Sequence, residues 1–86
     1  MKYLVEMTFT QAPTQDIMAL IPAERARGKE LDALGLRDRL YAASDFSKTW
    51  QVFVTKSPEQ LQQILESLPL YPFVTNIITP LAESAS

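Results

Sequence analysis

Glu24 is the side chain in this sequence best placed to transfer protons. In a helix counted at 100° per residue from Ile17, Glu24 falls inside an apolar stripe that also holds Leu20, Ile21, Gly28 and Leu31. A carboxyl group in such a stripe faces the interior, where desolvation raises its pKa toward the range useful for a general base. Gly28, one turn later, has no side chain and leaves room for a pocket. We therefore predict that Glu24 is catalytic.

A second interpretation of Glu24 stays open because Pro22 lies in the same segment. A proline at this place can shift the helical phase. Glu24 would then point to solvent or pair with Arg25 or Arg27 on its own helix.

One arginine and three aromatic residues are the candidates for ligand binding. Arg27 flanks the apolar stripe and is predicted to reach an anionic ligand group, whereas Arg37 and Arg39 flank an aspartate and are interpreted as solvated charges. Aromatic rings supply the walls of apolar pockets. We predict such walls from Trp50, Tyr71 and Phe73, with packing in the core or in a dimer interface as the alternative.

The composition removes several classes of chemistry. The 86 residues contain no cysteine and no histidine, so disulfides, thiolate nucleophiles, Cys- or His-based metal sites and imidazole catalysis are excluded. No D-x-D-x-D-G calcium loop occurs among the carboxylates. We predict neither a metal nor another cofactor.

Charge and hydropathy restrict the partners. The net charge of −2 and the pI near 4.9 argue against a nucleic-acid or anionic-membrane surface, which needs clustered positive charge. Residues 50–55 also lack the basic-glycine-aromatic pattern of RNA-recognition modules. No run is long enough to span a membrane, and Glu6 comes too early for the apolar core of a signal peptide. We expect a cytoplasmic protein.

The order of elements follows from periodicity and from helix start and stop signals. Residues 2–10 alternate as a strand, with Tyr3, Val5, Met7 and Phe9 on one face. A helix is predicted from Thr14 or Asp16 to Gly35, with Pro22 either kinking it or opening a second segment. Residues 36–46 and 49–56 predict two strands joined by a polar turn at Ser47 and Lys48. Ser57-Pro58-Glu59-Gln60 starts a second helix, which Pro69 and Pro72 end, and residues 73–81 form a last strand.

This order predicts an α+β, ferredoxin-like βαββαβ fold, with a four-stranded antiparallel sheet and two helices on one face. We expect one domain over residues 1–82 and a flexible tail at 83–86. Apolar side chains on both sides of the third strand, among them Trp50, Val52 and Phe53, would leave the second sheet face uncovered. A second subunit is the simplest cover, so we predict a homodimer or a larger homo-oligomer.

Two segments of the C-terminal half, QILESLPLYPF at residues 63–73 and ITPLA at residues 78–82, resemble the muconolactone isomerase family. Its members carry a Leu-Pro-Leu-aromatic-Pro-aromatic turn and a final strand that closes in Thr-Pro-Leu-Ala. The resemblance implies a ferredoxin-like subunit, tight dimers that assemble further, and cofactor-free migration of a double bond in an unsaturated lactone. We interpret the residues of these two segments as scaffold.

The second strand departs from the family pattern. Family members carry a Trp-Arg pair where this chain has Tyr41 and Ala42, and they have histidines where this chain has none. Losing the arginine removes a planar fork suited to a substrate carboxylate. Tyr41 keeps an aromatic ring, and its hydroxyl can donate to an enolate-like oxygen, so we predict a catalytic role for it. The alternative is a core aromatic whose hydroxyl reaches the surface.

Two functions compete on this basis. In the first, Glu24 removes a proton next to the carbonyl of a small unsaturated lactone or related compound, and a proton returns further along the conjugated system. In the second, the protein is a non-catalytic, oligomeric ligand-binding or regulatory module that kept the scaffold. The missing histidines and arginine favour the second function, whereas an inward Glu24 beside a cavity favours the first, which we expect.

Overall fold

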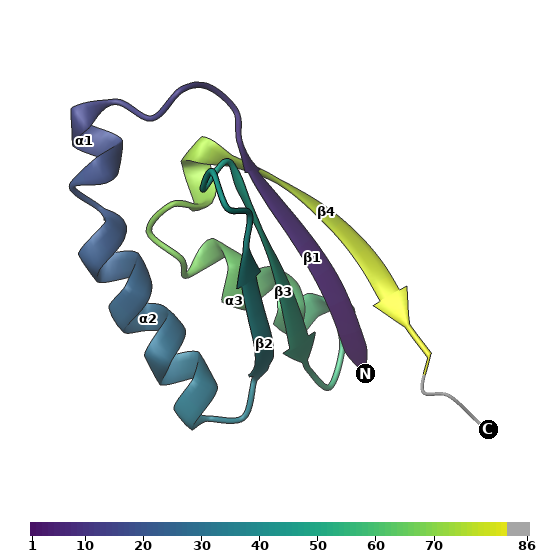
Figure 1. Cartoon of the computed structure of the whole chain (residues 1–86). Helices are drawn as coiled ribbons and strands as arrows, with labels where there is room; N and C mark the ends of the chain where they lie inside the picture. The colour runs from purple at the N-terminus through teal and green to yellow at the C-terminus, as the bar shows by residue number, and fades with distance from the viewer. Residues whose placement is uncertain (83–86) are drawn as a thin grey trace.

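The computed structural model describes residues 1–82, which form a four-stranded antiparallel sheet in the order β2-β3-β1-β4. Helices α2 and α3 pack on one face of this sheet (Figure 1). The predicted ferredoxin-like βαββαβ fold is therefore confirmed. The tail predicted at residues 83–86 lies outside the described residues. Along the chain the elements are β1 (Lys2–Phe9), α1 (Gln15–Met18), α2 (Ile21–Ala33), β2 (Arg37–Ala42), β3 (Lys48–Val54), α3 (Pro58–Glu66), the 3-10 turn η1 (Tyr71–Phe73) and β4 (Val74–Leu81).

The core lies between the sheet and the two helices. The alternation predicted for β1 is present, because Tyr3, Val5 and Met7 are buried while the residues between them are not. They pack with Phe53 of β3 and Leu31 of α2. Helix α3 completes this core with Leu61, Ile64 and Leu65, and Leu68 follows just after it.

Pro22 divides the first helical segment instead of kinking it. The Thr14 hydroxyl accepts a hydrogen bond from the Ile17 amide at 3.3 Å and starts the short helix α1. The chain then turns at Leu20, and α2 begins with Pro22 in its first turn, where a missing N–H costs no helical hydrogen bond. Gly35, with φ of 73°, ends the segment as predicted.

The two helices bury very different amounts of apolar side chain. Helix α3 buries Leu61, Ile64 and Leu65 within nine residues, whereas α2 buries only Gly28 and Leu31 within thirteen. Because burial of apolar side chains is the main force that holds a helix against a sheet, α2 has less apolar contact to hold it than α3. This sparse packing leaves the space for a cavity between α2 and the sheet.

The β2–β3 hairpin differs from its prediction on both sides of the turn. Strand β2 ends at Ala42 instead of residue 46, and Lys48, expected in the turn, is the first residue of β3. The turn closes when the Phe46 amide donates to the Ala43 carbonyl at 2.8 Å, with Phe46 at a left-handed φ of 60°. Within β2 a bulge between Arg37 and Arg39 places these two residues on opposite faces, with Arg37 toward the helices.

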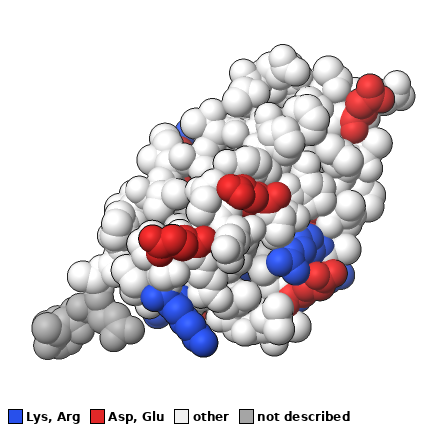
Figure 2. Space-filling model, turned by 180° about the vertical axis from the view of Figure 1, so that it is seen from behind, with Lys and Arg blue, Asp and Glu red and all other residues white. Residues whose placement is uncertain are grey.

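The face of the sheet opposite the helices carries apolar side chains. Partly buried Leu4, Trp50, Val52 and Val54 lie on it, together with exposed Ile77. On the side of the molecule seen in Figure 2, charged side chains are scattered over a mostly uncharged surface, and at the lower right a basic group lies against an acidic one. None of the helices within residues 1–82 is long and apolar enough to cross a membrane.

Candidate active site

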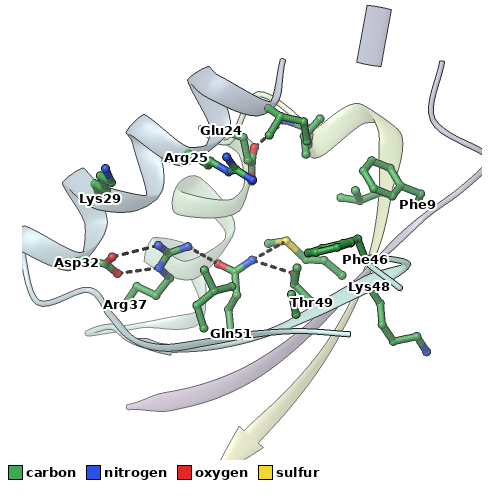
Figure 3. A pocket seen from close by; sticks show the side chains of 16 residues that line it. Phe9, Glu24, Arg25, Lys29, Asp32, Arg37, Phe46, Lys48, Thr49 and Gln51 are labelled. Atoms are coloured by element: carbon green, nitrogen blue, oxygen red, sulfur yellow. Dashed lines mark hydrogen bonds and ion pairs between the residues drawn. The ribbon is translucent and has the colours of Figure 1, made fainter. Parts of the chain in front are cut away.

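A cavity of about 510 Å³ lies between α2 and the helix-facing side of the sheet. Its apolar walls come from β1, α2, β2, the β2–β3 turn and the start of β4, namely Phe9, Ile21, Leu40, Phe46 and Val74. Charged side chains enter it from α2 and β2, namely Glu24, Arg25, Lys29, Asp32 and Arg37 (Figure 3). An apolar space with a few convergent polar groups is the usual form of a small-molecule site.

Glu24 lies in the wall of this cavity and is partly buried. Its Oε1 accepts a hydrogen bond from the Leu70 amide at 2.9 Å. Desolvation by burial raises the pKa of Glu24, and this effect outweighs the Leu70 N–H and the Arg37 charge, which both lower it. Within residues 1–82, no ion pair joins Glu24 to Arg25 or Arg27. The geometry is that of the interior-facing carboxyl group.

Leu70 belongs to the Leu-Pro-Leu-Tyr-Pro-Phe segment, whose resemblance to the family predicts a scaffold role. The segment folds into two consecutive tight turns, in which Tyr71 N–H donates to Leu68 at 3.0 Å and Phe73 N–H donates to Leu70 at 2.9 Å. The Leu70 amide remains available and points at Glu24. The segment is therefore part of the site as well as of the scaffold.

A chain of hydrogen bonds forms the floor of the cavity (Figure 3). The Arg37 guanidinium donates from Nε and Nη2 to the two carboxylate oxygens of Asp32 at 2.7 and 3.1 Å, and from Nη1 to Gln51 Oε1 at 3.1 Å. The Gln51 amide donates in turn to Thr49 Oγ1 at 3.2 Å and to Met7 Sδ at 3.0 Å. The interpretation of Arg37 as a solvated charge is wrong, because only 10% of its side chain is exposed.

The rim of the cavity carries positive charge. Arg25 and Lys29 are exposed on consecutive turns of α2, and neither forms an ion pair within residues 1–82. Lys48 turns away from the cavity and pairs with Glu6 at 2.8 Å (Figure 3). No three acidic side chains in the described part of the chain converge as a metal site would require.

The other predicted site residues lie elsewhere. Arg27 donates to Ser67 Oγ at 3.0 Å and pairs with Glu30 at 2.9 Å, outside the cavity. Tyr41 and Trp50 are cross-strand partners on the sheet face opposite the helices. The Tyr71 hydroxyl accepts from Gln62 at 3.0 Å and its residue borders a small crevice behind Glu24, while Phe73 is partly buried in η1 and does not line the cavity. Their functional roles stay predictions.

A model of the muconolactone delta-isomerase family matches residues 1–86. The chain belongs to this family. A crystal structure of muconolactone isomerase is similar to it with a TM-score of 0.87 and 25% identity, covering 100% of this chain and 93% of that chain. The 5-chloro-2-hydroxyhydroquinone dehydrochlorinase of Burkholderia phenoliruptrix AC1100, solved in complex with 2,5-dihydroxybenzoquinone, shares the fold with a TM-score of 0.77, 14% identity and coverage of 98% and 96%. No curated protein matches the sequence.

Proposed function

We propose that this family member catalyses cofactor-free migration of a double bond, by proton transfer, in a small unsaturated lactone or related carbonyl compound. The observation that carries the proposal is the Glu24 carboxyl group, partly buried in the wall of a largely apolar cavity, with a raised pKa and one oxygen held by the Leu70 amide. A base of this kind operates best when its pKa approaches the working pH.

The reaction needs one base that acts twice. The Glu24 carboxylate takes the proton from the carbon next to the substrate carbonyl, and the electron pair left behind spreads onto the carbonyl oxygen as a dienolate. The resulting carboxylic acid returns the proton to the carbon at the far end of the conjugated system. Proton and electrons balance within the substrate and Glu24, so no further reactant is required.

The cavity also indicates what kind of molecule it accepts. Phe9, Leu40 and Phe46 offer apolar surface to a flat, unsaturated body. Arg25 and Lys29 at the rim favour a substrate with a negative group, because neither side chain has a counterion in the described residues. A carboxylate-bearing lactone has both properties.

The test is the ultraviolet absorbance of muconolactone incubated with the protein and with its Glu24→Gln variant. The matched control is Glu30→Gln, because Glu30 is an exposed carboxylate on the same helix that pairs with Arg27 outside the cavity. We expect turnover by the wild type and by Glu30→Gln, and loss of turnover in Glu24→Gln. Binding of the lactone without any spectral change in the wild type would instead support the ligand-binding module.

We further propose that the subunit forms a homodimer through the sheet face opposite the helices. Trp50, Val52 and Ile77 on this face leave apolar surface in contact with water, and Tyr41 is 61% exposed beside Trp50. A second copy of the same face would remove this surface from water. Sedimentation should show a dimer that Val52→Lys dissociates, whereas a wild-type monomer at micromolar concentration would contradict this assembly.

A further inference from the structure

Helix α2 presents Glu24, Gly28 and Asp32 to the cavity region at intervals of four residues. This spacing places them on one stripe of the helix, with a carboxylate at each end and a glycine between them. Arg37 of β2 lies against this stripe. Its charge lowers the pKa of Glu24, and its guanidinium is bonded to Asp32.

Gly28 is the reason that the guanidinium fits. A Cβ atom at this position would lie 2.7 Å from Arg37 Nη2 and 2.8 Å from Nη1, closer than real Cβ atoms approach. The guanidinium cannot move aside without cost, because Asp32 and Gln51 hold it by three hydrogen bonds. Any other residue at position 28 would displace Arg37 from its place.

The same hydrogen bonds make Arg37 different in function from Arg25 and Lys29, the exposed cations at the rim of the cavity. Its guanidinium is already bonded to Asp32 and Gln51, so three of its five N–H groups have acceptors within the protein. Arg37 is therefore a fixed part of the cavity floor, while Arg25 and Lys29 remain available for an incoming anion.

We propose that Arg37, seated on Gly28 and held by Asp32 and Gln51, is the positioning residue that keeps Glu24 in its carboxylate form. Burial alone drives a carboxyl group toward its neutral form, which cannot accept a proton. A fixed positive charge at the next turn of the stripe opposes that tendency without bonding to Glu24 itself. The catalytic meaning of this arrangement rests on the proposed function, whereas the electrostatic arrangement does not.

The other groups around Glu24 have to be considered with Arg37. They come from α2, β2 and the turn before β4, and the charged or titratable ones are Arg25, Lys29, Asp32, Arg37 and Tyr71. Lys48 also borders the cavity, but its ammonium group is bonded to Glu6. Arg37 is the only cation among these groups that several hydrogen bonds hold in place within residues 1–82.

The first experiment follows the Glu24 carboxyl carbon by ¹³C NMR during a pH titration, in the wild type and in Arg37→Gln. We expect the pKa of Glu24 to rise in Arg37→Gln. The matched control is Arg39→Gln, because Arg39 lies on the same strand but on the opposite face of the sheet. Arg39→Gln should leave the titration unchanged. An unchanged pKa in Arg37→Gln would overturn the proposal.

A second experiment is a double-mutant cycle, which isolates the coupling between Gly28 and Arg37. A glycine-to-alanine change inside a helix normally raises the melting temperature. Gly28→Ala should lower it by several degrees and raise the pKa of Glu24, because it displaces the guanidinium. In an Arg37→Ala background the same change should be neutral or favourable. If Gly28→Ala has wild-type stability and an unchanged Glu24 titration, position 28 does not determine where the Arg37 guanidinium lies, and the proposal fails.

Two different failures can be told apart. If Glu24→Gln retains turnover, the proposed function fails, while the titration still decides the role of Arg37. If Glu24 is essential but the titration is the same with and without Arg37, only the positioning role fails. Where turnover is found, the acidic limb of its pH profile should move to higher pH in Arg37→Gln and not in Arg39→Gln.

Discussion

Replacing Asp32 with asparagine measures how much the Asp32–Arg37 pair in the floor of the cavity contributes to the free energy of unfolding. Asp32 accepts two charge-assisted hydrogen bonds from Arg37, at 2.7 and 3.1 Å. Each such bond is worth about 1.5–3 kcal/mol when fully protected from water. The Asp32 side chain is 49% exposed, which weakens the pair, and asparagine can keep one of the two bonds. We expect the free energy of unfolding to fall by about 1–2 kcal/mol at pH 7.

The pH dependence of this loss follows from the Asp32 carboxyl group. The side-chain hydrogen bond from Arg37 holds the pKa of Asp32 below its usual value. The stabilisation is therefore complete above the unfolded-state pKa near 3.9 and is lost as pH falls through the folded-state pKa. Asp32→Asn should be less stable than the wild type at pH 7, and the difference should shrink in strongly acidic solution.

Urea unfolding at neutral pH and in a series of acidic buffers provides the measurement. Asp38→Asn is the matched control, because Asp38 is an exposed aspartate on β2 that has no ion pair within residues 1–82. The reasoning is refuted if Asp32→Asn matches the wild type at pH 7. It is equally refuted if the two proteins keep the same difference at the lowest pH.

Three further substitutions give expected outcomes. Glu24→Gln should raise the free energy of unfolding at neutral pH while reducing turnover by about 10²- to 10⁴-fold. Because burial raises the folded-state pKa of Glu24, this gain should disappear at low pH, where the wild-type carboxyl is protonated, as urea unfolding at both pH values will show. Asn76→Val should stabilise the fold by about 1 kcal/mol in urea unfolding, because Asn76 Oδ1 is buried with no hydrogen-bond partner in the described residues. Leu31→Ala should cost about 2–5 kcal/mol in thermal or urea unfolding, because Leu31 is fully buried and anchors α2.

The parts of the fold that depend on local sequence were predictable. Alternation in β1 places Tyr3, Val5 and Met7 on the buried face whatever the partner strands are. The start of α3 follows from Ser57, whose hydroxyl accepts from the Gln60 amide at 3.1 Å, and from Pro58 in the first turn. The direction of the Glu24 side chain toward the interior was predictable in the same way, since the position of a residue on a helical stripe depends on local sequence alone.

The floor of the cavity was not predictable from local pattern. The Arg37 side chain is largely covered because a glycine on another element leaves space for it, and because a bulge turns it toward the helices. An alternating strand without a bulge would have placed Arg37 and Arg39 on the same face. The four-residue spacing of Glu24, Gly28 and Asp32 was the available signal, and it becomes meaningful only with a cation from a neighbouring strand.

Tyr41 shows the opposite case, in which the residue type suggested chemistry and the strand face excluded contact with the cavity. Its hydroxyl could serve an enolate-like oxygen, but Tyr41 pairs with Trp50 on the face away from α2. Arg27 likewise flanks the stripe in projection, yet its nearest partners are Glu30 and Ser67. A helical projection gives the direction of a side chain but not the element that meets it.

The bulge in β2 also determines how this chain is to be compared with others. Arg37 pairs with Phe53, and Arg39 pairs with Val52, so Asp38 is the extra residue between two consecutive rungs of the ladder. Deleting Asp38 would restore a regular ladder without moving any side chain to the other face. A homologue one residue shorter in this segment would therefore keep the same inward and outward positions. The gap in an alignment belongs at Asp38, because a gap placed after the bulged segment would match outward-facing Arg39 with an inward-facing residue.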